Sequence, residues 1–166
     1  MAAGGAPEVL ALRLWRRLGG RPAGRWLFSR IVCFKAPYFG SIRPLLLALE
    51  PGRCQAQLRQ RRRVQNHIGT VHAIALCNLA ELCAGLVTDV SIPADMRWIP
   101  KGMDVRYLAK ARGTITATAR PRVKPESSPE PYNLVIAVSV RDREGVEVAA
   151  ADITMWVTPR TRSRQA

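Results

Sequence analysis

Histidine, paired cysteines and aromatic residues are all scarce in this chain. Only two histidines are present among the 166 residues, and aromatic side chains make up 6% of the sequence. The four cysteines include no Cys-x-x-Cys pair, and no histidine spacing completes a zinc site. The sequence therefore predicts no metal centre, and it implies no cofactor.

A long run of uncharged apolar residues is also missing. The nearest approach is residues 72–88, which contain His72 and Glu81. We therefore interpret this stretch as a buried core helix rather than a membrane span. Cys77 and Cys83 fall within it, and we expect both to be buried as small apolar side chains.

The chain lacks a recognisable signal peptide, because arginines interrupt the apolar stretches near its start. With reduced thiols expected at all four cysteines, this favours a cytoplasmic location. An Arg-rich, acid-poor start also suits an organellar transit peptide. A single serine among the first 40 residues is few for such a peptide.

Arginine is the residue present in excess. The net charge is +14, and residues 1–63 hold 13 basic but only 2 acidic side chains. This asymmetry suits an anionic partner, such as a phosphate-bearing ligand, nucleic acid or an anionic membrane, and it equally suits a solvated surface. No aromatic residue interleaves with the arginines of residues 59–63, so no specific nucleic-acid partner is predicted.

Hydrophobic periodicity predicts three helices before residue 50, at 9–18, 25–34 and 41–49. Trp15, Trp26 and Phe28 accompany arginines in the first two helices, and we expect these residues to pack on the main domain. Binding to a membrane surface is the alternative, with less support. We divide the chain into a basic helical extension at 1–36, whose first eight residues are expected to be disordered, a main domain at 37–158 and a basic tail at 159–166.

Residues 53 onward predict one strand, one long helix and then four strands. Alternation of apolar and polar residues with β-branched content marks the strands, and a Pro-rich loop separates two of them. Consecutive strands imply an antiparallel sheet, and a helix that is apolar all round needs a wide cover such as a curved sheet. The predicted fold class is therefore α+β, with elements at 53–64 (strand), 71–88 (helix), and 103–110, 114–119, 132–141 and 146–157 (strands).

Glu81 is the only formally charged side chain between Arg63 and Asp89. Burying a carboxylate without a partner is costly, so such a group is usually paired, protonated or functional. His72 precedes it by nine residues, and Asn66 precedes His72 by six. We interpret this set as a candidate catalytic constellation.

The stretches NHIGTVHAIALCNLAELCAGL and RWIPKGMDVRYLAKARG, with this order of elements, resemble the hotdog fold, in which an antiparallel sheet wraps a central helix. Asn66, Gly69, His72 and Glu81 hold the relative places of functional residues in acyl-CoA thioesterases of the phenylacetyl-CoA type. The chain is also similar to a related hotdog family of unknown function. The resemblance covers about residues 37–158, and it departs where Ala73 and Ile74 replace the usual Gly-Gly.

The resemblance implies an acyl-CoA thioester hydrolase that forms a homodimer, or a tetramer, with sites at the subunit interface. Nine helical residues rise ~13.5 Å, so His72 and Glu81 of one chain cannot contact the same atom. We therefore expect each site to combine Asn66, Gly69 and His72 of one subunit with Glu81 of the other. The substrate would be a thioester of CoA or of an acyl-carrier protein.

In this scheme Glu81 acts as general base or nucleophile, and Asn66 positions the attacking water or the carboxylate. His72 orients the carbonyl or assists the leaving thiolate, and an N–H at the helix start, that of Ala73 or a neighbour, stabilises the oxyanion, with Gly69 helping to position the substrate. Structural alternatives stay open: an interface ion pair for Glu81, a helix cap for His72 and a turn for Asn66.

A basic rim would suit the phosphates of CoA. Ordinary solvated charges are an equally good explanation for these residues. The alternative function is that of a non-catalytic hotdog protein that binds acyl-CoA or a fatty ligand. The candidate rim residues are Arg112, Arg120, Arg122 and Lys124.

Overall fold

The computed structural model describes residues 9–160. The expectations of disorder for residues 1–8 and of a basic tail beyond residue 160 lie outside this range. The elements, in chain order, are α1 (Leu10–Leu18), α2 (Pro22–Lys35), η1 (Pro37–Ser41), β1 (Leu45–Glu50), β2 (Arg53–Arg59), η2 (Arg62–Val64), α3 (Ala73–Ser91), β3 (Met96–Tyr107), β4 (Thr114–Pro121), β5 (Tyr132–Arg141) and β6 (Glu147–Pro159).

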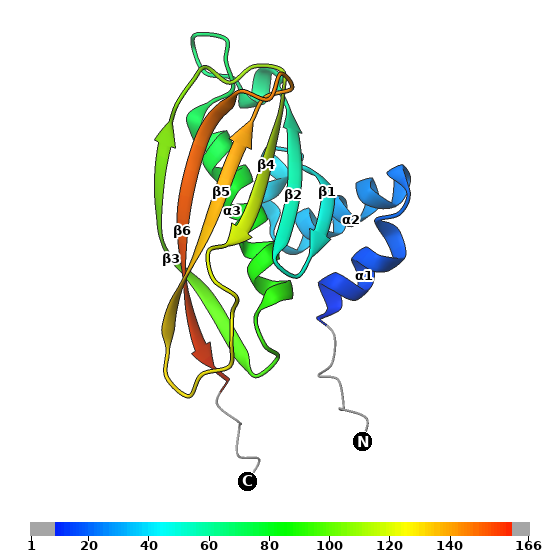
Figure 1. Cartoon of the computed structure of the whole chain (residues 1–166). Helices are drawn as coiled ribbons and strands as arrows, with labels where there is room; N and C mark the ends of the chain where they lie inside the picture. Colours follow the sequence, from blue (N-terminus) through cyan, green and yellow to red (C-terminus); the bar gives the residue numbers. More distant parts are fainter. Residues whose placement is uncertain (1–8, 161–166) are drawn as a thin grey trace.

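The six strands form one antiparallel sheet in the order β1-β2-β4-β5-β6-β3. The long helix α3 lies along one face of this sheet, while α1 and α2 lie beside the β1 end (Figure 1). This is the hotdog arrangement, and it confirms the predicted fold class. β3 occupies the opposite edge of the sheet and pairs only with β6 within the described chain.

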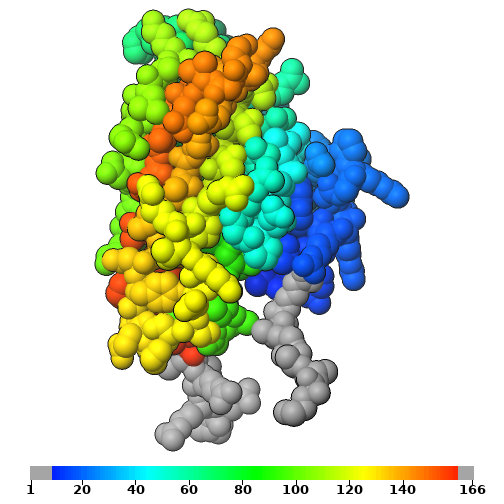
Figure 2. Space-filling model, in the orientation of Figure 1, coloured from blue at the N-terminus to red at the C-terminus, as the bar shows by residue number. Residues whose placement is uncertain are grey.

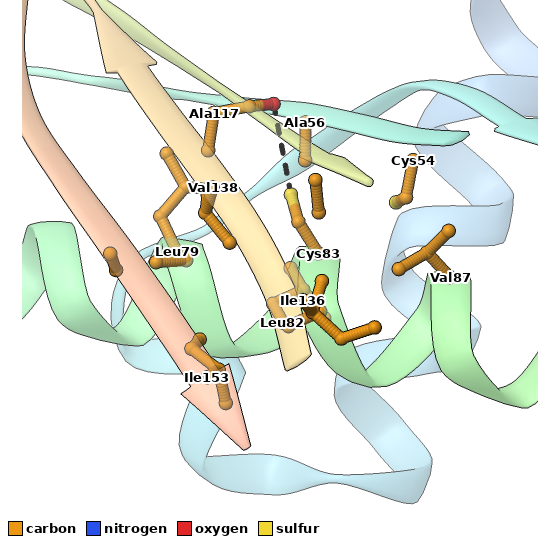
Figure 3. Packing of buried hydrophobic residues seen from close by; sticks show 14 of the residues in the cluster. Cys54, Ala56, Leu79, Leu82, Cys83, Val87, Ala117, Ile136, Val138 and Ile153 are labelled. Atoms are coloured by element: carbon orange, nitrogen blue, oxygen red, sulfur yellow. Dashed lines mark hydrogen bonds between the residues drawn. The ribbon is translucent and has the colours of Figure 1, made fainter. Parts of the chain in front are cut away.

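Alternation of side chains explains how the sheet covers α3. Along β4, Ile115, Ala117 and Ala119 are buried, while the threonines between them face away from the core. Small residues on the strands let the helix approach closely, and the thiol of Cys83 lies 3.8 Å from the carbonyl oxygen of Ala117 (Figure 3). α3 is long and apolar enough to cross a membrane by composition alone, but most of it is buried here, as predicted for a core helix.

The helix predicted at 41–49 is wrong. Residues 45–50 form strand β1, in which Leu46 and Leu49 point into the core and Leu46 pairs with Ala56 of β2. Leucine and alanine favour helices intrinsically, so this segment gives a helical signal. Pairing with β2 outweighs that preference because it buries both leucines.

The first of the four later strands begins earlier than predicted. β3 pairs with β6 from Met96 to Tyr107, whereas the sequence indicates a start at residue 103. Pro100 and Gly102 obscure the first half, and the register shifts between these two residues. An edge strand tolerates proline, because one side of its backbone needs no partner within the chain. The strand predicted at 53–64 ends at Arg59.

The two N-terminal helices pack against each other and against the domain. The ring centroids of Trp15 and Phe28 lie 5.1 Å apart in an edge-to-face arrangement, and Phe28 is buried. The hydroxyl of Ser29 accepts a hydrogen bond from the N–H of Leu46 and donates one to the carbonyl of Arg25. Packing therefore accounts for Trp15 and Phe28, whereas Trp26 stays exposed.

Candidate active site

The loop before α3 is held in shape by the side chain of Asn66. Its Oδ1 accepts hydrogen bonds from the N–H groups of Ile68 and Thr70, at 3.2 and 3.0 Å, and its Nδ2 donates to the hydroxyl of Thr70 at 2.8 Å. These contacts are local turn contacts. In the single chain, Asn66 therefore orders the loop.

Gly69 lies at the tip of this loop with a φ of +73°. A side chain at this backbone conformation would be strained, which explains the glycine. The N–H of Gly69 donates to the carbonyl of Asn66, and its own carbonyl accepts from the Gln60 side chain. Gly69 thus fixes the path by which the loop reaches the helix.

His72 is the N-cap of α3. Its Nδ1 accepts a hydrogen bond from the N–H of Ile74 at 3.1 Å, so in this arrangement the proton of a neutral imidazole sits on Nε2. The N–H of Ala73, at the first position of the helix, has no hydrogen-bond partner among residues 9–160. This N–H and the helix dipole make a place for a negatively charged oxygen.

A cavity of about 420 Å³ lies beside this loop, and we call it the loop cavity. Asn66, Thr70 and Ala73 line it on one side, and residues 107–111 close it on the other. Two of the predicted site residues, Asn66 and Ala73, therefore face one common space.

Tyr107 is a member of this cavity that sequence reasoning missed. Its hydroxyl lies 3.0 Å from the thiol of Cys77, and this hydrogen bond, with partial desolvation, raises the pKa of Tyr107 to about 12. Cys77 is only half-buried, so the prediction that it is a buried apolar residue is wrong, whereas Cys83 is buried as predicted. The thiol of Cys77 thus contacts Tyr107, which lines the loop cavity.

Glu81 lies more than two turns further along α3 and faces a different space. This second pocket has a volume of about 470 Å³, and we call it the helix pocket. Its walls are mainly apolar and come from α1, α2, α3 and β3. Its apolar lining includes Leu14, Phe28, Val32, Leu82, Leu86 and Trp98.

The carboxylate of Glu81 is half-buried on the wall of the helix pocket, and it has no hydrogen bond or ion pair within the described range. Asp89 and Lys35 are the other charged residues that line this pocket. A carboxylate without a partner beside apolar walls is costly, so its position favours a contact with a group from outside the chain.

One chain does not bring His72 and Glu81 together, as the rise along α3 predicts. The edge strand β3 borders both spaces: Trp98 and Pro100 line the helix pocket, and Tyr107 lines the loop cavity.

The four basic residues considered for CoA phosphates are divided by the structure. Arg112 precedes β4, next to the loop cavity, while Arg120, Arg122 and Lys124 lie at the other end of that strand. Arg122 already has an acidic partner within the chain. Its Nη2 donates to both carboxylate oxygens of Asp152, at 2.7 and 2.8 Å. The four residues do not form one rim within a single chain.

Comparison with known structures finds the same fold in other proteins. The crystal structure of the genomics protein APC5556 is 43% identical, with a TM-score of 0.77 over 93% of this chain and 100% of that one. A probable thioesterase, PA5026 of Pseudomonas aeruginosa, is 24% identical, with a TM-score of 0.71 over 80% and 93%. The thioesterase HI1161 of Haemophilus influenzae is 16% identical, with a TM-score of 0.65 over 77% and 87%.

These last two likenesses, both under 25% identity, show a shared fold. No protein among curated sequences matches the chain. The match that covers most of the chain, residues 24–157, is to a domain of unknown function, DUF4442. The chain belongs to the DUF4442 family and has the hotdog fold.

Proposed function

We propose that this protein is an acyl-thioester hydrolase in which Glu81 of one subunit and the loop before α3 of a second subunit form each site. The observation that carries the proposal is the unpaired carboxylate of Glu81 on the wall of a mainly apolar pocket. Such a pocket suits an aliphatic acyl chain, and the carboxylate suits an acid–base step beside it. The shared fold with proteins described as thioesterases supports this reaction class.

The reaction needs few groups. Glu81 takes a proton from water as the water oxygen bonds to the thioester carbonyl carbon, or it attacks that carbon itself to form an anhydride, which water then hydrolyses to release the acid and restore the carboxylate. The N–H of Ala73 donates to the oxyanion that develops. Collapse of the intermediate breaks the C–S bond, and the thiolate leaves and takes a proton. Nε2 is the nitrogen of His72 that would serve this step, since its Nδ1 is used as a cap.

The edge strand supports a homodimer. β3 is 12 residues long, its outer edge has no partner within the described chain, and Ile99 and Tyr107 on it are exposed. Such an edge is a ready template for pairing with another strand. Asp104 and Arg106 flank Val105, so an antiparallel pair of β3 strands centred on Val105 would set each Asp104 opposite Arg106 of the other copy.

This register has a consequence for the site. With Val105 at the centre, residues 108–110 of one copy lie alongside residues 100–102 of the other. The first range borders the loop cavity, and Pro100 borders the helix pocket. The dimer would therefore join the loop cavity of one subunit to the helix pocket of its partner, which is what a site using both Ala73 and Glu81 needs.

A panel of acyl-CoA esters of increasing chain length tests the function directly by thiol release. We expect hydrolysis, with kcat/KM rising about fourfold for each methylene that reaches the helix pocket, because each buried methylene contributes about 0.8 kcal/mol. Release from no ester, and from no acyl-carrier thioester, would contradict the proposal. Tight binding of the same inert esters would then favour the alternative, a non-catalytic protein that binds acyl-CoA.

His72 offers a test that separates chemistry from capping. His72→Ser keeps a side chain that caps helices well, whereas His72→Ala removes the cap and should cost about 1 kcal/mol of stability. If the imidazole orients the carbonyl or assists the thiolate, both variants should lose hydrolysis by ~100-fold. Thermal melts and initial rates of the two proteins supply both readouts. A fully active His72→Ser protein would leave His72 with the cap alone.

A further inference from the structure

One face of α2 is unexplained by packing within the chain. Phe28 and Ser29 are buried on the inner face, but Trp26, Leu27 and Phe34 on the outer face are 59%, 43% and 86% exposed. At 100° per residue these three side chains fall within an arc of about 100°. Tyr38, in the following short helix, is 73% exposed. Figure 2 shows side chains of this N-terminal segment projecting from the flank of the molecule.

Arginines without acidic partners lie beside this apolar strip. Arg30 and Arg61 are anchored by backbone carbonyls, with Nη2 of each donating to Pro44 and Ser41 respectively. Two further nitrogens, Arg30 Nε and Arg61 Nη1, are buried and have no hydrogen-bond partner. No carboxylate pairs with either guanidinium within the described part of the chain.

The same arginines repel one another. Burial lowers the pKa of Arg61, and the positive charges of Arg43, Arg63 and Arg30 lower it further. Like charges held this close are destabilising unless an anion lies among them. We call these residues the arginine cluster: Arg30, Arg43, Arg61 and Arg63. The described part of the chain places no negative charge among them, so the cluster needs an anion from outside.

We propose that the apolar strip of α2 and η1 and the adjacent arginine cluster dock the protein on an anionic phospholipid bilayer. Trp26, Leu27 and Phe34 would enter the boundary between headgroups and acyl chains, as the apolar face of an interfacial helix does. The guanidiniums would contact lipid phosphates, which relieves their mutual repulsion. Nucleic acid also carries phosphates, but it offers no apolar layer in which the side chains of the strip on α2 could be buried.

The docked orientation fits the rest of the molecule. α1 and α2 form one wall of the helix pocket through Leu14, Phe28 and Val32, so the bilayer would lie against the outer side of that wall. The β3 edge lies on the opposite side of the sheet, and it stays free for a second copy (Figure 1). Docking does not depend on hydrolysis, so a failure of either proposal leaves the other standing.

Co-sedimentation with vesicles tests the proposal on the full chain. One set of vesicles is phosphatidylcholine alone, and the other contains one-third phosphatidylglycerol. We expect binding to the anionic vesicles only, weakened by salt. Arg43→Gln with Arg63→Gln should weaken it about 25-fold, or about fivefold per arginine. Trp26→Ser with Phe34→Ser should weaken it at least tenfold, and both side chains are exposed enough to be replaced without unfolding.

A matched control removes one exposed apolar and one basic residue elsewhere on the surface. Val123→Ser with Arg120→Gln should leave vesicle binding unchanged, and thermal melts should match for all variants. A second readout is quenching of Trp26 fluorescence by lipids brominated on their acyl chains, with Trp26→Phe as the blank. Insertion predicts quenching that disappears in the blank.

Three results would overturn the proposal. Equal binding to both kinds of vesicle would remove the role of the arginine cluster. Absence of any vesicle binding would remove the docking surface itself. Binding of a DNA or RNA oligonucleotide that persists in the Trp26→Ser, Phe34→Ser protein, together with weak vesicle binding, would assign the arginines to nucleic acid instead.

Discussion

Glu81→Gln should lower thioester hydrolysis by ~100-fold or more and leave the protein folded. Glutamine has the shape of glutamate, but it neither accepts a proton nor attacks a carbonyl carbon. The carboxylate has no hydrogen bond or ion pair that the substitution would break within residues 9–160. The measurement is the rate of thiol release from the best ester of the panel, at saturating substrate.

The control for this variant lies in the same pocket. Asp89→Asn removes a second carboxylate from the wall of the helix pocket, eight residues further along α3, and should change the rate only slightly. The melting temperature of Glu81→Gln should equal or exceed that of the parent, because a half-buried charge is replaced by a neutral amide. A large drop in melting temperature with an unchanged rate would instead make Glu81 a structural acid, paired across the dimer.

The sequence predicts the last three strands well, because apolar and polar side chains alternate along them, and it predicts the central helix well by the length of its apolar stretch. β1 is not predictable in this way. Its residues, LLLALE, favour a helix, and only the long-range pairing with β2 decides for a strand. The start of β3 is hidden for a related reason, since Pro100 is acceptable only at a sheet edge, and edges are not visible in sequence.

The candidate site divides along the same line. Glu81 stands out in the sequence because it is a lone charge in an apolar stretch, and Asn66 and His72 stand out by their spacing. The helix pocket is not visible in the sequence. Part of its wall comes from α1 and α2, which the sequence assigns to a separate extension. Tyr107 escapes notice for the same reason, because its contact with Cys77 joins residues 30 positions apart.

Ala73→Pro should lower hydrolysis by ~100- to 1,000-fold, which is the loss typical for one oxyanion-hole donor. Proline removes the single N–H proposed to hold the oxyanion. The substitution suits the fold, because proline is favoured at the first position of a helix. His72, which precedes it, already has an extended backbone, with a φ of −65° and a ψ of 137°, as a residue before proline requires.

Circular dichroism and thermal melts check that the helix survives. An active Ala73→Pro protein would remove the N–H of Ala73 from the mechanism. An inactive but well-folded Ala73→Pro protein carries an intact Glu81, whereas the Glu81→Gln protein carries an intact loop before α3. Together the two variants can test whether one site uses residues of two subunits.

Mixing these two inactive proteins in equal amounts under conditions of subunit exchange should restore about a quarter of the parent rate. Half of the random dimers contain one chain of each kind, and each such dimer has one of its two sites intact. Mixing Glu81→Gln with the double variant Glu81→Gln, Ala73→Pro should restore nothing, because no pairing then supplies both groups. If each chain instead held its own site, both mixtures would stay inactive, and the composite site would be ruled out.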